Sequence, residues 1–155
     1  MPASFRTLTA ASLCAALSAG AALAQDAEAA IKARQSHMTL YAHNLGIIGA
    51  MAQGNMAYDA EMAAQAASDL NALAVLSQQA YWPEGSSNAD GVETKALPAI
   101  WEDMDDFHSK MDALHEATMA MEGAAGESLE ALQGQMQALG GACGGCHREY
   151  RQRDD

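Results

Sequence analysis

The stretch IWEDMDDFHSKMDALHEATMAM, residues 100–121, decides the fold class of this chain. Apolar residues recur in it every three or four positions, and this spacing places their side chains on one stripe of an α-helix. Its alternating steps of four and three are also the period of helices that pack side by side at shallow crossing angles. The stretch therefore predicts one long helix of a bundle, and Pro98 suits its first turn. The stripe consists of Ile100, Met104, Phe107, Met111, Leu114, Thr118 and Met121.

Three further helices are expected around this one. The first carries Ile31, Arg34, Met38, Tyr41, Leu45, Ile48 and Ala52 on one stripe and ends at Gly54-Asn55. The second begins after Asp59, a residue type that caps helices, and turns Met62, Ala66, Leu70, Leu73 and Leu76 inward. The last follows a break at residues 123–126 and aligns Leu129, Leu132, Met136, Leu139, Cys143, Cys146 and Tyr150. With a turn-rich connection over residues 81–98, we predict an all-α, antiparallel four-helix bundle.

The composition excludes other classes of protein. The 155 residues suffice for one compact domain, and 36 are Ala and 10 Met against only two Val and four Ile. Residues that pack well on pleated sheets are thus scarce, while helix formers abound. The net charge of -12 argues against nucleic acid as a partner, because such binding depends on Lys and Arg. The sequence contains no hydrophobic span long enough to indicate a membrane protein.

The amino end has the features of a cleaved signal peptide. Arg6 precedes an Ala-rich apolar run that closes with Ala22-Leu23-Ala24, a small-x-small cleavage pattern. We therefore expect residues 1–24 to be removed, together with Cys14, and residues 25–155 to form the mature bundle. This predicts export to the periplasm.

The strongest chemical signal is Cys143-Gly144-Gly145-Cys146-His147, the C-x-x-C-H pattern of c-type haem attachment. Two thiols three residues apart on a helix point to one side and can add to the two vinyl groups of one porphyrin. The imidazole of His147 would then be the proximal iron ligand. The sequence predicts one haem c, covalently bound through Cys143 and Cys146, inside the bundle.

Three other uses of these cysteines are weaker. A disulfide would close a very short loop and leave His147 unexplained. A zinc site needs a fourth ligand at matching spacing, and a thioredoxin-like redox pair needs a β-α-β context. The remaining histidines, His37, His43, His108 and His115, flank the apolar stripes, and we interpret them as solvated side chains rather than metal ligands.

The chain resembles the class II cytochromes c, the cytochrome c-prime family. The resemblance covers nearly the whole mature chain, and the position of C-x-x-C-H at the extreme carboxyl end separates this class from other small c-type cytochromes. Its specific segments are Ile31-Lys32-Ala33-Arg34-Gln35, Ala96-Leu97-Pro98-Ala99-Ile100-Trp101 and Cys143-Gly144-Gly145-Cys146-His147-Arg148-Glu149-Tyr150-Arg151.

Arg34 interrupts the inward stripe of the first helix, and an inward cation needs an anion. The haem propionates would supply one through paired hydrogen bonds, and the alternative is an Arg that extends to the bundle surface. The resemblance implies the same propionate role, with Gln35 beside Arg34 and Arg151 as a basic residue near the proximal ligand.

The resemblance places Met38 on the distal side of the haem. If its sulfur binds iron, the site is six-coordinate, low-spin and suited to electron transfer. If Met38 only packs there, the iron is five-coordinate, and an apolar distal face admits NO or CO but offers O2 no hydrogen-bond donor. We favour the packing role, which is the ordinary one for Met in a core.

The sequence thus predicts a periplasmic haem protein that transfers electrons, binds small gases, or does both. Its partners would be a redox protein or a gas molecule. No nucleophile or general base stands out, so we expect no enzyme; a haem enzyme that reduces NO or peroxide, or an exported module with a disulfide, are the alternatives. The resemblance also suggests a homodimer through the first two helices, with close approach at Gly46, Gly49, Ala63 and Ala67.

Overall fold

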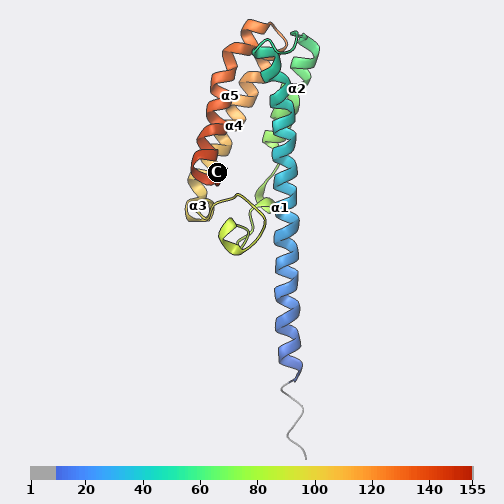
Figure 1. The fold of residues 1–155 in the computed structure, drawn as a ribbon, viewed down its shortest axis with the longest axis vertical. Helices are drawn as coiled ribbons and strands as arrows, with labels where there is room; N and C mark the ends of the chain where they lie inside the picture. The colour runs from blue at the N-terminus through green and yellow to red at the C-terminus, as the bar shows by residue number, and fades with distance from the viewer. Residues whose placement is uncertain (1–9, 155) are drawn as a thin grey trace, which may run out of the picture.

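The structure is a computed structural model that describes the backbone of residues 10–154 and the side chains of residues 27–154. The predicted signal peptide therefore lies partly outside the described residues. Within the described part, α1 (Ala10–Ala52) is one continuous helix that extends beyond the other helices toward its amino end (Figure 1). No helix among the described residues combines the length and apolar character needed to span a bilayer.

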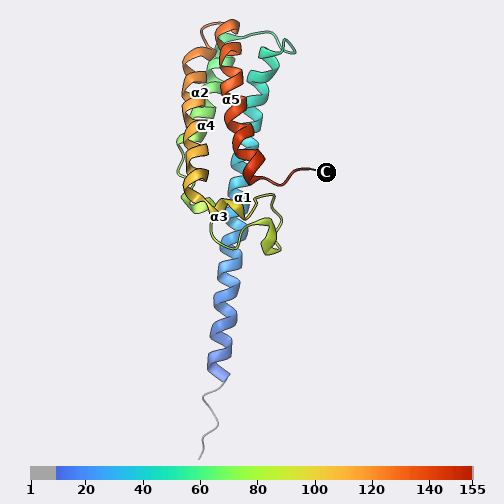
Figure 2. The same ribbon diagram turned by 90° about the vertical axis from the view of Figure 1, so that its left-hand side faces the viewer.

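Four long helices form the predicted four-helix bundle. Each contacts two neighbours, in the ring order α1, α2, α4 and α5, as the two views show together (Figures 1 and 2). Short helices η1 and η2 lie in the connection between α2 and α4, and α3 directly precedes α4. The remaining bounds are α2 Ala60–Val75, η1 Gln79–Tyr81, η2 Asn88–Asp90, α3 Ala99–Glu102, α4 Met104–Ala125 and α5 Leu129–Tyr150.

Side-chain caps set the starts of three helices. The Asp59 carboxylate accepts a hydrogen bond from the Met62 backbone N–H at 2.8 Å, which confirms the predicted start of α2. The Ser128 hydroxyl caps α5 in the same way. The predicted third helix is in fact two, because the backbone leaves helical geometry at Asp103, whose carboxylate then caps α4.

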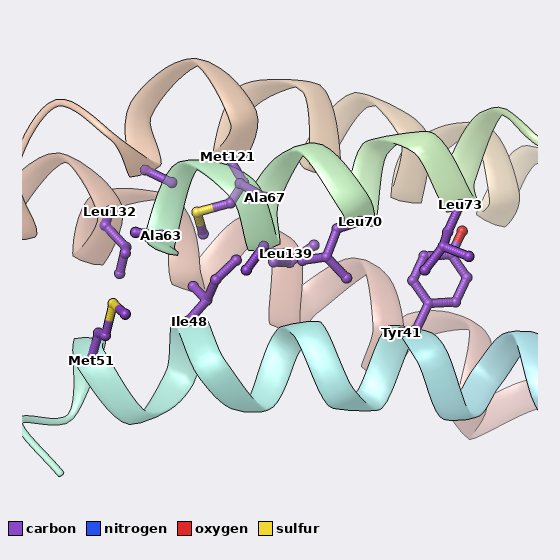
Figure 3. Packing of buried hydrophobic residues seen from close by; sticks show 12 residues of the cluster. Tyr41, Ile48, Met51, Ala63, Ala67, Leu70, Leu73, Met121, Leu132 and Leu139 are labelled. Carbon is purple, nitrogen blue, oxygen red and sulfur yellow. The ribbon is translucent and has the colours of Figure 1, made fainter. Parts of the chain in front are cut away.

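The buried core consists of two clusters at different levels of the bundle. The larger joins α1, α2, α4 and α5, and Figure 3 shows its side chains in a row that ends at Tyr41. The smaller is built on Ile100, Phe107 and Tyr150, with Cys146 and Met111 packed against it. The stripes of α4 and α5 therefore face inward as predicted.

Of the five residues predicted inward on the second helix, Ala66, Leu70 and Leu73 are buried, and the other two are not. Met62 and Leu76 were expected inward but are exposed, while Ala63 and Ala67 are fully buried beside Leu70. Small alanines let α2 approach its neighbours closely, and Met62 is displaced to the surface. Since Ala63 and Ala67 lie in the core of their own chain, the prediction that they form a dimer contact is wrong.

The connection between α2 and α4 is attached to the end of α5. Leu97 N–H donates to the Tyr150 carbonyl at 3.0 Å, and Gln152 N–H donates to the Lys95 carbonyl at 2.8 Å. Ala96 and Arg151 thereby form a short antiparallel bridge. This places the connection beside the residues that follow the C-x-x-C-H motif.

Candidate cofactor site

Cys143, Cys146 and His147 lie within about one turn of α5. Both cysteines are free and half-buried, so the alternative of a disulfide between them is absent from the described structure. Burial raises the pKa of both thiols, that of Cys146 to about 11. They are therefore neutral at pH 7, on the inward side of the helix.

The surroundings of the two cysteines fit a large flat cofactor. Leu139, one turn before Cys143, belongs to the larger core cluster, whereas Cys146 packs against the smaller one. The motif thus sits where the two clusters meet, and α1 and α5 diverge toward this end of α5 (Figure 1). A Cβ added at Gly140 or Gly141 would meet nothing within 4 Å. Both glycines are exposed, so no other part of the chain covers this stretch of α5 beside the thiol pair, and a group can lie against the helix there.

His147 is the exposed member of the motif. Partial burial lowers the pKa of its imidazole, and the Arg151 charge lowers it further. Arg151 is half-buried and stands just past the end of α5, with a salt bridge to Asp154 at 3.1 Å. Arg151 is thus near His147 in space, as the resemblance implies, although it no longer continues the helix face.

Arg34 is buried, at 4% exposed, and does not extend to the bundle surface. Its guanidinium donates to the Ser86 hydroxyl at 2.9 Å, the Ser86 carbonyl, the Thr94 hydroxyl at 2.9 Å and the Tyr81 carbonyl at 3.1 Å. It also stacks over the Trp82 ring at 4.8 Å. Burial lowers the pKa of Arg34 to about 10, so it stays charged at pH 7. These partners are neutral and take four of the five N–H groups of the guanidinium, so none of them offsets its charge.

Gln35 is exposed and contacts the same α2–α4 connection as Arg34. Its side-chain amide donates to the Glu93 carbonyl at 3.0 Å. Arg34 and Gln35 together therefore fix the α2–α4 connection along α1. This is a contact with the chain itself, which the sequence did not indicate.

Met38 is the residue that the resemblance places on the distal side of the haem. It is 37% exposed, and the position on the inward stripe between Arg34 and Tyr41 is held by His37, only 3% exposed. The expectation that His37 is solvated is therefore wrong. His37 packs against the rings of Tyr41 and Tyr81, with ring centroids 4.9 and 5.7 Å away. Burial lowers its pKa, against an opposing contribution from a hydrogen bond with the Leu73 backbone.

A charged network adjoins the proximal end of the site. The Tyr150 hydroxyl donates to Asp106 at 2.6 Å, and Lys110 pairs with Asp106 at 3.4 Å and Glu149 at 3.2 Å. The hydrogen bond from Tyr150 lowers the pKa of Asp106, and the charge of Lys110 adds to this effect. The network joins α4 to the last turn of α5, next to Cys146. Asp106, near the start of α4, thus has a structural role in this network.

The other histidines form no site in the described structure. His43 and His108 are exposed and His115 half-buried. No group of three or more His, Cys, Asp or Glu side chains that could hold a metal ion occurs among the described residues.

A helical bundle with a thiol pair and a histidine on its last helix is the architecture of a c-type cytochrome with a C-terminal attachment site. Residues 29–151 match the model of the Cytochrome C' family, and the chain belongs to this family. A cytochrome c-554 of Cereibacter sphaeroides is 49% identical over 136 residues, 86% of this chain and 89% of the relative. A cytochrome c' of the same organism is 40% identical, over 94% of this chain and 97% of the relative.

Solved structures agree with this assignment. The cytochrome c' described as from Rhodobacter Spheriodes superposes with a TM-score of 0.80 at 38% identity, covering 83% of this chain and 98% of that one. A nitric oxide complex of a mutant of cytochrome c prime from Alcaligenes xylosoxidans gives 0.72 at 29% identity, covering 83% and 97%. The predicted fold is thus confirmed, and so is the predicted cofactor: a c-type haem, covalently attached through Cys143 and Cys146.

Proposed function

We propose that this protein is a periplasmic haem protein that binds a small gas such as NO or CO at a His147-ligated iron and exchanges single electrons with a redox partner. The observation that carries the proposal is the half-buried thiol pair of α5 with His147 one residue further, between two core clusters. A c-type haem supplies reversible one-electron chemistry and an iron that takes axial ligands. The residues of this chain determine how that group is held and what reaches it.

His147 is the proposed axial ligand, and Arg151 the basic residue near it. The lowered pKa of His147 keeps its ring neutral at pH 7, the form in which imidazole nitrogen binds a metal. Lys110, Asp106 and Tyr150 brace the same turn of α5 against α4. We infer that this network holds the imidazole in a fixed orientation.

Arg34 is the proposed partner of a haem propionate, with Gln35 fixing the neighbouring connection. Support comes from a buried guanidinium that has only neutral partners, because an anion would offset the cost of burying its charge. The measurement that tests this is the reduction potential of Arg34→Met against that of wild type. Loss of a cation from the site is expected to lower the potential, since the oxidised form carries the extra positive charge.

We propose that Met38 packs beside the iron and does not ligate it. Packing is the ordinary role of a Met side chain, because its flexible thioether fills irregular space beside apolar groups. Binding of NO is supported by the solved nitric oxide complex of a relative.

The second candidate function is a low-spin electron carrier with Met38 as sixth ligand. The 49% identity to a protein named cytochrome c-554 rather than cytochrome c' favours it. Ferric absorption spectra with and without NO distinguish the two.

An enzymatic activity is not part of the proposal. The relatives quoted above bear the names of cytochromes, and no nucleophile or general base was expected from the sequence.

We propose export to the periplasm because a signal peptide is expected over residues 1–24. Amino-terminal sequencing of protein recovered from the periplasm would give Gln25 as the first residue.

We further propose a homodimer through α1 and α2. A groove of about 640 Å3 lies between these helices. Its lining includes the apolar Leu40, Ile47 and Met62, of which Leu40 and Met62 are exposed, and the acidic Asp59, Glu61 and Asp69. Clustered exposed apolar side chains favour a partner surface. Sedimentation equilibrium of wild type and Leu40→Glu tests this. A wild-type dimer that becomes a monomer in the variant supports the contact. A wild-type protein that is already a monomer contradicts it.

A further inference from the structure

The inward face of α1 carries polar side chains where a bundle core is normally apolar. Arg34, His37, Tyr41 and Asn44 follow one another along this face, and each is more than 90% buried. Asn44 donates to the Leu40 carbonyl of its own helix, and Arg34 donates to the α2–α4 connection. The His37 Nε2 atom and the Tyr41 hydroxyl are buried with no hydrogen-bond partner.

These two unpartnered atoms need an explanation. Leaving a buried polar atom unsatisfied costs about 1–3 kcal/mol, and nearly all such atoms in native proteins find a partner. Phe at either position would fill a similar volume without that cost. The atoms also lie one turn apart, with ring centroids 4.9 Å apart. A shared partner from outside the chain accounts for both.

The register of the helices places this pair at the haem site. α1 and α5 run antiparallel, and Figure 3 shows Met51 near Leu132 at one end of the core and Tyr41 at the other. Along α5, Leu139 is the last buried residue before the cysteines. Tyr41 therefore lies at the level of the first cysteine and His37 one turn beyond it, on the helix that faces α5.

We infer that the Tyr41 hydroxyl, oriented by the His37 ring packed against it, donates a hydrogen bond to the small ligand bound at the haem iron. This inference rests on the proposed function and deepens it. The ligand class is a diatomic gas whose outer atom accepts a hydrogen bond. The pocket is then polar on its α1 side, in contrast to the wholly apolar distal face expected from the sequence.

The chemistry of Tyr41 suits a donor. Burial raises its pKa to about 12, with a further contribution from the Cys143 thiol nearby, so the hydroxyl keeps its proton at neutral pH. A typical hydrogen bond within a protein contributes a net free energy of about 0.5–1.5 kcal/mol, and we take the same range for the bond to the ligand. That range corresponds to roughly a 2- to 10-fold change in the dissociation rate.

The experiment uses the ferrous CO adduct of the holoprotein in a Met38→Ala background, which opens the sixth position whatever the role of Met38. The C–O stretching frequency is measured for this parent, for Tyr41→Phe and for Tyr58→Phe. Tyr58 is the matched control, because its hydroxyl donates to the Ala125 carbonyl at the far end of the bundle. We expect Tyr41→Phe to shift the stretch to higher frequency and to speed CO dissociation about 2- to 10-fold, with Tyr58→Phe unchanged.

Other outcomes overturn the inference. If Tyr41→Phe and the parent share one frequency, or if the parent forms no CO adduct, Tyr41 is not a ligand donor. His37→Phe should give a smaller shift in the same direction; no shift there contradicts the orienting role of His37. A protein without covalent haem would instead refute the proposed function itself, so the two failures can be told apart.

Discussion

Arg34 donates hydrogen bonds to both oxygens of Ser86, a residue 52 positions further along the chain. Ser86 is completely buried, and its hydroxyl in turn donates to the Pro83 carbonyl at 2.7 Å. This pair fixes the α2–α4 connection to α1, one turn before Met38. The same connection bonds to Tyr150 beyond the haem-attachment motif. The two sides of the site are therefore joined through one segment.

Ser86→Ala tests the strength of this attachment. Removing the hydroxyl leaves a buried guanidinium N–H without its partner, which is expected to lower the free energy of unfolding by about 1–3 kcal/mol. Urea denaturation of the holoprotein measures it. Ser77→Ala, at an exposed position, is the matched control and should change stability little. Equal effects of the two substitutions would show that the Arg34–Ser86 contact contributes nothing.

The hydrogen bond from Tyr150 to Asp106 predicts a pH-dependent stability. It lowers the folded-state pKa of Asp106, so folding favours the charged carboxylate. The stabilisation is therefore present above the unfolded pKa of about 3.9 and is lost as the pH falls through the lower folded value. We expect the stability difference between wild type and Tyr150→Phe to be full near about pH 6 and to shrink below about pH 4.

The control for this pH effect is Tyr58→Phe. Its hydroxyl bonds to a backbone carbonyl, which does not titrate, so the stability difference from wild type should stay constant over the same range. Chemical denaturation at a series of pH values gives both curves. If the stability difference from wild type depends on pH in the same way for both variants, the ionisation of Asp106 does not contribute to stability.

The haem is expected to stabilise the glycine-rich part of α5. Gly140, Gly141, Gly144 and Gly145 lie within a continuous helix, at a cost of about 3–4 kcal/mol relative to alanine. The double variant Cys143→Ser/Cys146→Ser cannot form thioether bonds, and we expect lower helicity and a lower melting temperature by far-UV circular dichroism. Unchanged helicity and melting would mean that the chain alone holds this helix.

Met38→Ala separates the two candidate functions. If Met38 only packs, ferric wild type and variant share a high-spin spectrum and neither shows a sulfur-to-iron charge-transfer band. Resonance Raman spectroscopy of both proteins checks this. A low-spin wild type that becomes high-spin in the variant would make Met38 an iron ligand and favour the electron carrier.

The helices could be predicted because their apolar periods are long and their caps local. The stripe of α5 and the cap at Asp59 involve residues close in sequence, so no tertiary information is needed. The break at Asp103 was missed, because the same carboxylate can lie inside a helix or cap the next one. There the packing of α3 and α4 against the end of α5 is decisive.

The α1 site residues show the limit of pattern reading. Between Arg34 and Tyr41, either Met38 or His37 has the helical spacing of an inward residue. Hydrophobicity favours Met38 for the inward position. The structure turns His37 inward, because Tyr81 from the distant connection and Tyr41 pack against its ring. Likewise, the partners of Arg34 lie 47 to 60 residues away and could not be read from its neighbours.

Mass spectrometry of the processed polypeptide, recovered from the periplasm and denatured, tests the central claim most directly. A chain that begins at Gln25 and retains the mass of one haem, with both Cys143 and Cys146 modified on peptide mapping, is the predicted result. A denatured chain of unmodified mass, with two alkylatable thiols, would contradict it.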